Sequence, residues 1–250
     1  MKKALHTNHA HPREDMDCRR RPREVCRKGI YMKITRPIRA VLFDMDGVII
    51  DSEPIHNKVV KEVLLENNIV VDDEEFNKLI GMTSTSVFSY FIDKHHLPYT
   101  PEEMTNNHMN FFKKYIVDHN LKPIDGICPL LEQLQKANIP LAIASSSPLN
   151  VIEFVVKTFN IDKYFKFLIS GEDILHSKPA PDIYLKTAKK LQVNPKGCVV
   201  LEDSKNGSIA AKDAGMYCIG FANPNSGNQD LSRADTIIKQ ISDINITQLP

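Results

Sequence analysis

From Arg39 onward, short apolar runs alternate with longer stretches in which apolar residues recur at helical spacing. The apolar runs are AVLF, PLAIAS, FKFLIS, CVVLE and YCIGF, and turn or polar residues bound each of them. Continuous apolar runs of this length are typical of strands covered on both faces, as in a parallel sheet. The helical patterns between them are Pro129–Ala137, Leu149–Asn160, Asp182–Leu191 and Lys205–Ala214. This alternation predicts an α/β fold with a doubly wound parallel sheet.

One interval, residues 52–121, interrupts the alternation, because it contains helical patterns and no run that is typical of a strand. We therefore expect an inserted helical subdomain at 52–121, with the α/β core formed by residues 32–51 and 122–250. The insertion follows the first strand, so it should lie above the carboxyl ends of the strands. Open α/β sheets bind their ligands at that edge.

Composition and charge exclude several classes of function. Residues 1–31 carry nine Lys/Arg and four Asp/Glu, and they lack sustained apolar periodicity. We interpret them as a disordered basic arm or an N-terminal extension. Residues 32–250 hold 23 basic and 27 acidic residues, so the body is mildly acidic and nucleic-acid binding is not expected. No apolar run approaches the ~20 residues of a membrane span.

The five cysteines are scattered and odd in number. This pattern indicates reduced thiols and a cytoplasmic protein, not a disulfide framework. No apolar stripe is left without an expected role in the core, and we therefore expect a monomer.

Four clusters of chemically capable residues follow the predicted strands or lie in the loops after them. They are Asp44 with Asp46, Ser145, Lys178, and Glu202 with Asp203. Each cluster alone could be an ordinary turn or helix cap. Parallel strands end at one edge of the sheet, however, so the four clusters should meet there. Two carboxylates as close as Asp44 and Asp46 need a cation or a shared proton to coexist.

Together these residue types suit phosphoryl transfer. Asp44, Asp203 and Glu202 are candidate ligands of Mg²⁺, which prefers carboxylate oxygens and waters. Lys178 and Ser145 would neutralise and hydrogen-bond phosphoryl oxygens.

The two aspartates of the first cluster suit different parts of the reaction. Asp44 would form an aspartyl-phosphate as nucleophile. Asp46 would protonate the leaving oxygen and later deprotonate the attacking water or hydroxyl.

The motifs DMDGV, ASSS, SKPAPD and EDSKNG, in this order, resemble the haloacid dehalogenase superfamily over roughly residues 38–240. The helical insertion is similar to the cap of its β-phosphoglucomutase-like branch. The resemblance implies a Rossmann-like core, Asp44 as nucleophile and Asp46 as general acid/base. It also implies that the Asp46 backbone carbonyl joins Asp44 and Asp203 on Mg²⁺. The second aspartate argues against dehalogenation.

The cap determines what else can bind. The resemblance places Ser84 at the position of a mutase arginine that grips a distal phosphate, and His108 near a mutase lysine. His56 matches a mutase histidine that contributes to closure. We predict substrate contacts at His56, Ser84 and Ser146.

These features favour a Mg²⁺-dependent phosphohydrolase acting on a small phosphorylated metabolite, such as a sugar or polyol phosphate. A β-phosphoglucomutase-type mutase is the alternative, followed by other phosphotransfer or phosphonate chemistry. A different class of function also stays open: a protein that binds a phosphometabolite or a partner without turnover, with the basic arm as its contact surface.

Overall fold

The computed structural model describes residues 38–77, 79 and 84–245. The predicted arm at residues 1–31 lies outside the described residues. Six strands form one parallel sheet in the order β3-β2-β1-β4-β5-β6. The strands are β1 (Ala40–Phe43), β2 (Leu141–Ser145), β3 (Phe165–Ser170), β4 (Cys198–Glu202), β5 (Tyr217–Phe221) and β6 (Thr236–Ile238). All five predicted runs are strands, whereas the short edge strand β6 was not predicted.

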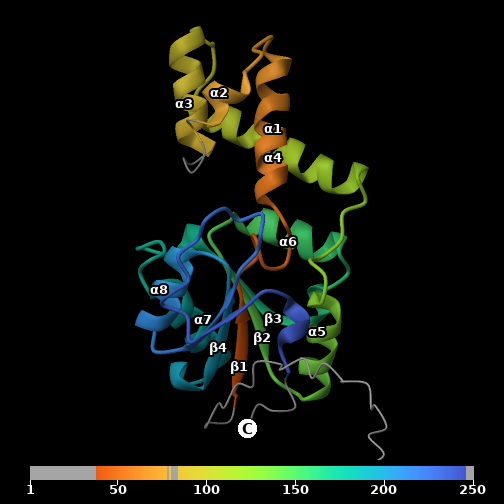
Figure 1. Cartoon of the computed structure of the whole chain (residues 1–250), viewed down its shortest axis with the longest axis vertical. Helices are drawn as coiled ribbons and strands as arrows, with labels where there is room; N and C mark the ends of the chain where they lie inside the picture. Colours follow the sequence, from red (N-terminus) through yellow and green to blue (C-terminus); the bar gives the residue numbers. More distant parts are fainter. Residues whose placement is uncertain (1–37, 78, 80–83, 246–250) are drawn as a thin grey trace, which may run out of the picture.

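Helices cover both faces of this sheet, which explains why the central strands β1, β2 and β4 are buried along their whole length. Val41 and Phe43 of β1 pack with residues of α5 (Ile127–Lys136) and α6 (Leu149–Thr158). Ala40 and Leu42 face the other way and pack with α7 (Asp182–Leu191) and α8 (Lys205–Asp213). Successive side chains of a strand point to opposite faces, so a strand between two helix layers needs apolar residues at every position. The predicted doubly wound α/β fold is confirmed (Figure 1).

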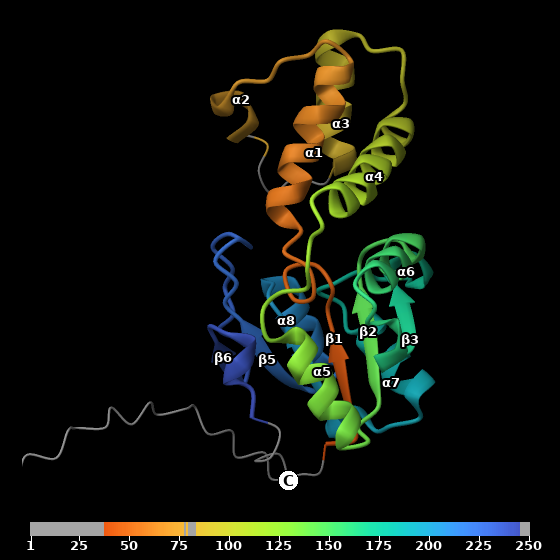
Figure 2. The ribbon, with the colours of Figure 1, turned by 90° about the vertical axis from the view of Figure 1, so that its right-hand side faces the viewer.

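In the described part of the chain, four helices form the cap, which stands over the carboxyl ends of β1, β2 and β3 (Figure 2). They are α1 (Glu53–Glu66), α2 (Asp73–Asn77), α3 (Ser84–His95) and α4 (Pro101–Asp118). Phe88, Phe91 and Phe112 are fully buried, as expected for residues of a helical core. In the part of the chain that the structure describes, no helix has the length and apolarity needed to cross a membrane.

A local signal fixes where α4 begins. The Thr100 side chain accepts a hydrogen bond from the Glu103 backbone N–H, and the Glu103 carboxylate accepts one from the Thr100 backbone N–H. This reciprocal capping box satisfies two amides that the helix itself leaves unpaired, and Pro101 suits the first helical position. Among the residues that the structure describes there are also four short 3₁₀ helices: η1 (Asp162–Tyr164), η2 (Gly171–Asp173), η3 (Pro195–Gly197) and η4 (Ile241–Asp243).

Candidate active site

The neighbouring strands β1 and β4 bring three carboxylates together. Phe43 pairs with Leu201, and the Asp44 backbone N–H donates to the Leu201 carbonyl at 3.0 Å, so both chains leave the sheet at the same level. Asp44, Glu202 and Asp203 are all buried, and each offers an oxygen within 4.8 Å of the others. The first and fourth clusters therefore lie together, as predicted, because β1 and β4 are paired in parallel and end at the same edge.

The close approach of these two clusters depends on Gly47. Its φ is 72°, in the left-handed region where a side chain is disfavoured. A Cβ at this position would lie 1.8 Å from Oδ2 of Asp203. Glycine at position 47 thus permits both the turn after β1 and the contact with the end of β4.

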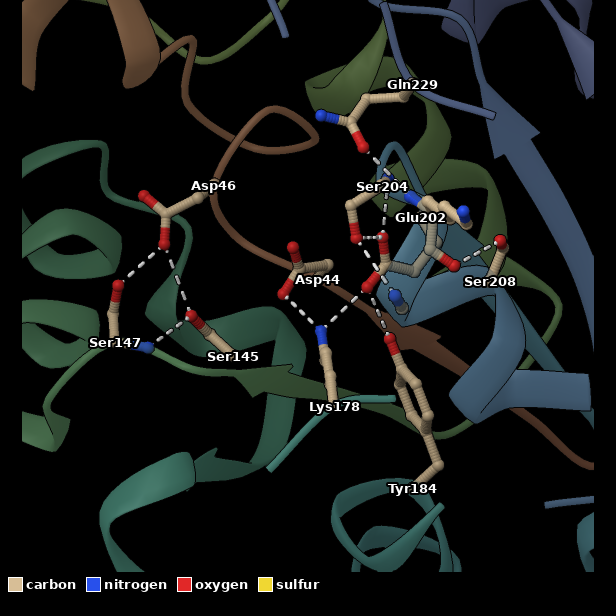
Figure 3. Close-up of polar contacts among 12 residues, drawn as sticks. Asp44, Asp46, Ser145, Ser147, Lys178, Tyr184, Glu202, Ser204, Ser208 and Gln229 are labelled. Carbon is tan, nitrogen blue, oxygen red and sulfur yellow. Dashed lines mark hydrogen bonds and ion pairs between the residues drawn. The ribbon is translucent and has the colours of Figure 1, made fainter. Parts of the chain in front are cut away.

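Lys178 bridges two of the carboxylates (Figure 3). Its Nζ donates to Oδ1 of Asp44 at 2.9 Å and to Oε1 of Glu202 at 2.7 Å. Burial alone would lower the pKa of Lys178, but the two carboxylates raise it above its ordinary value. The ammonium is therefore charged at neutral pH and lies beside the candidate nucleophile.

Glu202 is bonded to protein groups at both of its oxygens. Tyr184 donates to Oε1 at 2.9 Å, and the backbone N–H and hydroxyl of Ser204 donate to Oε2 at 2.9 Å each. Burial alone would raise the pKa of Glu202, but Lys178 and these donors lower it. Gly207 leaves room for this carboxylate, since a Cβ there would lie 1.5 Å from Oε1. The arrangement makes Glu202 an anchor for Lys178, and its role as a metal ligand stays a prediction.

Asp46 points away from the three carboxylates. Its Oδ2 accepts a hydrogen bond from the Ser147 hydroxyl at 2.6 Å and lies 3.4 Å from the Ser145 hydroxyl (Figure 3). Its Oδ1 is buried and has no hydrogen-bond partner among the described residues. The structure thus separates the two carboxylates of the first cluster into different environments, as their different predicted roles require.

Ser145 and Ser147 differ from expectation. Ser145 is fully buried and accepts a hydrogen bond from the Ser147 backbone N–H at 3.0 Å. Ser147, which the sequence analysis did not select, is the closer partner of Asp46. The motif ASSS contains three successive hydroxyls, and periodicity cannot tell which of them points at the aspartate once the strand has ended.

The donor set suits a divalent cation. Burial, followed by repulsion from Glu202, raises the pKa of Asp203 to about 7. Burial also raises the pKa of Asp44 well above its usual range. Three buried carboxylates meet here beside the Lys178 ammonium, and a hard cation would relieve their excess charge and favour their ionised forms.

A cavity of about 470 Å³ opens onto these groups. Its lining comes from the core: Asp44, Asp46, Ser146, Lys178, Ser204, Lys205, Asn206 and Gln229. Ser146 lines this cavity, and its contact with substrate stays a prediction. Lys205, Asn206 and Gln229 were not predicted, and the first two belong to the EDSKNG motif that supplied the acids.

The three cap residues singled out by the sequence lie at different distances from the site. Nε2 of His56 lies 4.0 Å from Oδ1 of Asp46, and its ring stacks on Phe112. Nδ1 of His56 lies 3.3 Å from Nε2 of His108, which is fully buried within the cap. Ser84 begins α3 and is half-buried, and it is not among the described residues that line the cavity.

Comparison with known proteins shows the family of this chain. The model of the haloacid dehalogenase-like hydrolase family matches residues 41–221. The chain belongs to this family. It is 31% identical over 207 residues to hexitol phosphatase B of Escherichia coli (strain K12), covering 79% of this chain and 89% of that relative.

Two solved structures are similar in fold to this chain. The structure of CbbY from Rhodobacter sphaeroides in complex with phosphate has a TM-score of 0.74 at 26% identity, covering 85% of this chain and 99% of that one. The β-phosphoglucomutase of Clostridium difficile has a TM-score of 0.67 at 25% identity, covering 84% and 94%. The predicted family, branch and fold are confirmed, as is the prediction of a phosphatase-type enzyme.

Proposed function

We propose that this chain is a Mg²⁺-dependent phosphohydrolase that releases phosphate from a small sugar or polyol phosphate through an aspartyl-phosphate on Asp44. The observation that carries the proposal is that the two aspartates of the first cluster lie in different surroundings at the sheet edge. Asp44 lies beside the Lys178 ammonium and the acidic cluster, whereas Asp46 is held apart by Ser147. Hexitol phosphatase B, a relative by sequence, supports the substrate class.

In the first half-reaction, an oxygen of Asp44 attacks phosphorus while the bond from phosphorus to the ester oxygen breaks. Asp46 donates its proton to that departing oxygen, and the alcohol leaves. Lys178 and Ser146 line the same cavity, where the ammonium and a serine hydroxyl would supply positive charge and hydrogen bonds to phosphoryl oxygens. Mg²⁺, held by Asp44 and Asp203, would neutralise phosphate charge that otherwise repels the nucleophile.

In the second half-reaction, Asp46 removes a proton from water as the water oxygen attacks phosphorus. Inorganic phosphate leaves, and Asp44 is regenerated as a carboxylate. The same carboxyl group therefore acts first as acid and then as base. The hydroxyl of Ser147 orients Asp46 in both steps.

A sugar phosphate mutase is the second candidate, and two observations favour it. The fold is similar to a β-phosphoglucomutase, and His56 of the cap faces Asp46. A mutase must hold a bisphosphate while it turns over, which requires a fixed cation for the second phosphate. The residue at the matching cap position is Ser84, which carries no charge, so hydrolysis is favoured.

We also propose that the protein works in the cytoplasm. The described cysteines Cys128, Cys198 and Cys218 are free thiols, which supports a reducing compartment.

The test is phosphate release from a panel of hexose, pentose, hexitol and glycerol phosphates, with Mg²⁺ and with a chelator. The panel includes β-glucose 1-phosphate with a trace of the 1,6-bisphosphate, assayed for both phosphate and glucose 6-phosphate. Mg²⁺-dependent release would support the phosphohydrolase. Formation of glucose 6-phosphate without release of phosphate would favour the mutase. If neither phosphate nor glucose 6-phosphate forms, a binding protein without turnover would be favoured.

A further inference from the structure

The segment 222–229, which follows β5, contacts three separate parts of the site. The Asn223 side chain donates to the Gly47 carbonyl at 2.9 Å, in the turn that carries Asp46. The Ser226 hydroxyl donates to Oδ2 of Asp203. Gln229 accepts a hydrogen bond from the Lys205 backbone N–H at 3.1 Å, at the start of α8 (Figure 3). None of these contacts is needed to close the sheet, so they call for another explanation.

The segment has a fixed shape of its own. Asn223 is only 7% exposed. Its side-chain oxygen accepts a hydrogen bond from the Asn225 backbone N–H at 2.9 Å, and its backbone carbonyl accepts one from the Ser226 N–H at 3.3 Å. An asparagine that bonds the backbone two residues onward closes a tight turn. Ser226, which donates to Asp203, therefore lies in a turn that these hydrogen bonds fix.

The Ser226 hydroxyl limits how the Asp203 carboxylate can rotate. One oxygen of Asp203 is fixed by this bond, and the close packing against Gly47 leaves it little space. A candidate metal ligand that is hydrogen-bonded in this way binds its ion with less loss of freedom. The contact thus has the properties of an outer partner that orients a ligand.

The same segment also holds the first linker between core and cap. Asp51 lies two residues before α1. Its Oδ1 accepts from the Asn223 amide at 3.2 Å, and its Oδ2 accepts from the Asn225 amide. Asn225 and Ser226 are adjacent in the chain. A shift of the linker is therefore passed to the partner of Asp203 across a single peptide unit.

We propose that segment 222–229 couples the cap linker to the metal site, with Ser226 as a positioning residue for Asp203 and with Asn225 as its connection to Asp51. This inference rests on the proposed Mg²⁺-dependent function. It goes further by assigning a role to residues outside all four catalytic motifs.

The experiment measures Mg²⁺ binding to the full chain by isothermal titration calorimetry, without substrate. Ser226→Ala should weaken Mg²⁺ affinity by about tenfold, the effect expected for losing an outer partner of a ligand. Ser226→Thr keeps the hydroxyl and should restore most of the affinity. Ser232→Ala removes an exposed serine from the same connection and serves as the matched control, with unchanged affinity.

The connection to the cap is tested separately. Asn225→Ala should weaken Mg²⁺ affinity by about threefold, although Asn225 does not touch Asp203, because coupling across a network is smaller than loss of a direct partner. Asn228→Ala is the control, since Asn228 is an exposed asparagine of the same segment. Both asparagines are exposed, so these variants should fold even if Ser226→Ala does not.

The outcomes separate this inference from the proposed function. A wild-type chain that binds no Mg²⁺ would overturn the proposed function itself. A wild-type chain that binds Mg²⁺, with Ser226→Ala and Asn225→Ala equal to their controls, would overturn the inference alone. Loss in Ser226→Ala without loss in Asn225→Ala would refute the coupling to the cap.

Discussion

The sheet edge and the cap place their polar side chains in different ways. At the sheet edge, Asp44 and Asp203 emerge directly from the ends of paired strands, and Lys178 bonds Asp44 at 2.9 Å. In the cap, His56 approaches Asp46 only to 4.0 Å, and Ser84 is absent from the described lining of the cavity. This difference supports the proposal that the sheet edge carries the chemistry.

The largest effect should come from Asp44→Asn, which removes the nucleophile. We expect phosphate release to fall by more than about 10⁴-fold, since no covalent intermediate can form. The amide is close in shape to the carboxylate, and Lys178 keeps its bond to Glu202, so the fold should persist. Steady-state assays and circular dichroism test both parts. Activity near wild type would contradict the assignment of Asp44.

Asp46→Asn should have the next largest effect, a loss of activity of about 10²–10³-fold, because a general acid/base group typically contributes a rate factor of this size. The loss should shrink for p-nitrophenyl phosphate, whose leaving group needs no proton. Ser146→Ala, at the same cavity, should lose activity equally on both substrates. The comparison uses kcat/KM, which reports the formation of the aspartyl-phosphate and not the second half-reaction that both substrates share. Equal losses of kcat/KM in Asp46→Asn on good and poor leaving groups would show that Asp46 is not the acid.

We expect a smaller effect from His108 of the cap, and we expect it on the free energy of unfolding. Burial, followed by the charge of His56, lowers the pKa of His108 to about 3 in the folded chain. The unfolded chain therefore binds more protons below about pH 6.5, and stability is lost as the pH falls from that value. At pH 5 the loss from this one group should be about 2 kcal/mol relative to pH 7.

His108→Leu should remove that part of the pH dependence. Urea unfolding at pH 7 and pH 5 measures it as the change in the free energy of unfolding between the two pH values. His119→Leu replaces an exposed histidine just after the same helix, leaves His108 in place and serves as the matched control. A His108→Leu variant with the same difference between the two pH values as wild type would contradict the buried, uncharged state of His108.

The smallest effect should come from Ser84→Ala. Because Ser84 is outside the described cavity lining, kcat/KM for the best substrate should change by less than about twofold. A larger loss, confined to KM, would mean that cap closure brings Ser84 to the substrate. The division between sheet edge and cap would then need revision.

The amino-acid sequence by itself predicted five of the six strands described, and it predicted that residues at the strand ends would share one edge. β1, β3, β4 and β5 have the limits that the apolar runs predicted, because strands between two helix layers are mostly apolar. Residues at the ends of parallel strands share one edge, so Asp44 and Asp203 could be placed together before any coordinates were known.

Tertiary structure decided the partners of these groups. That Ser147 is the closer partner of Asp46, that Tyr184 anchors Glu202 and that Ser226 holds Asp203 all depend on loop and helix geometry. Strand periodicity ends where the loops begin, and a serine there is indistinguishable in sequence from an ordinary turn residue. The sequence could therefore locate the chemistry, whereas the side chains that orient it became visible only once the loops were packed against one another.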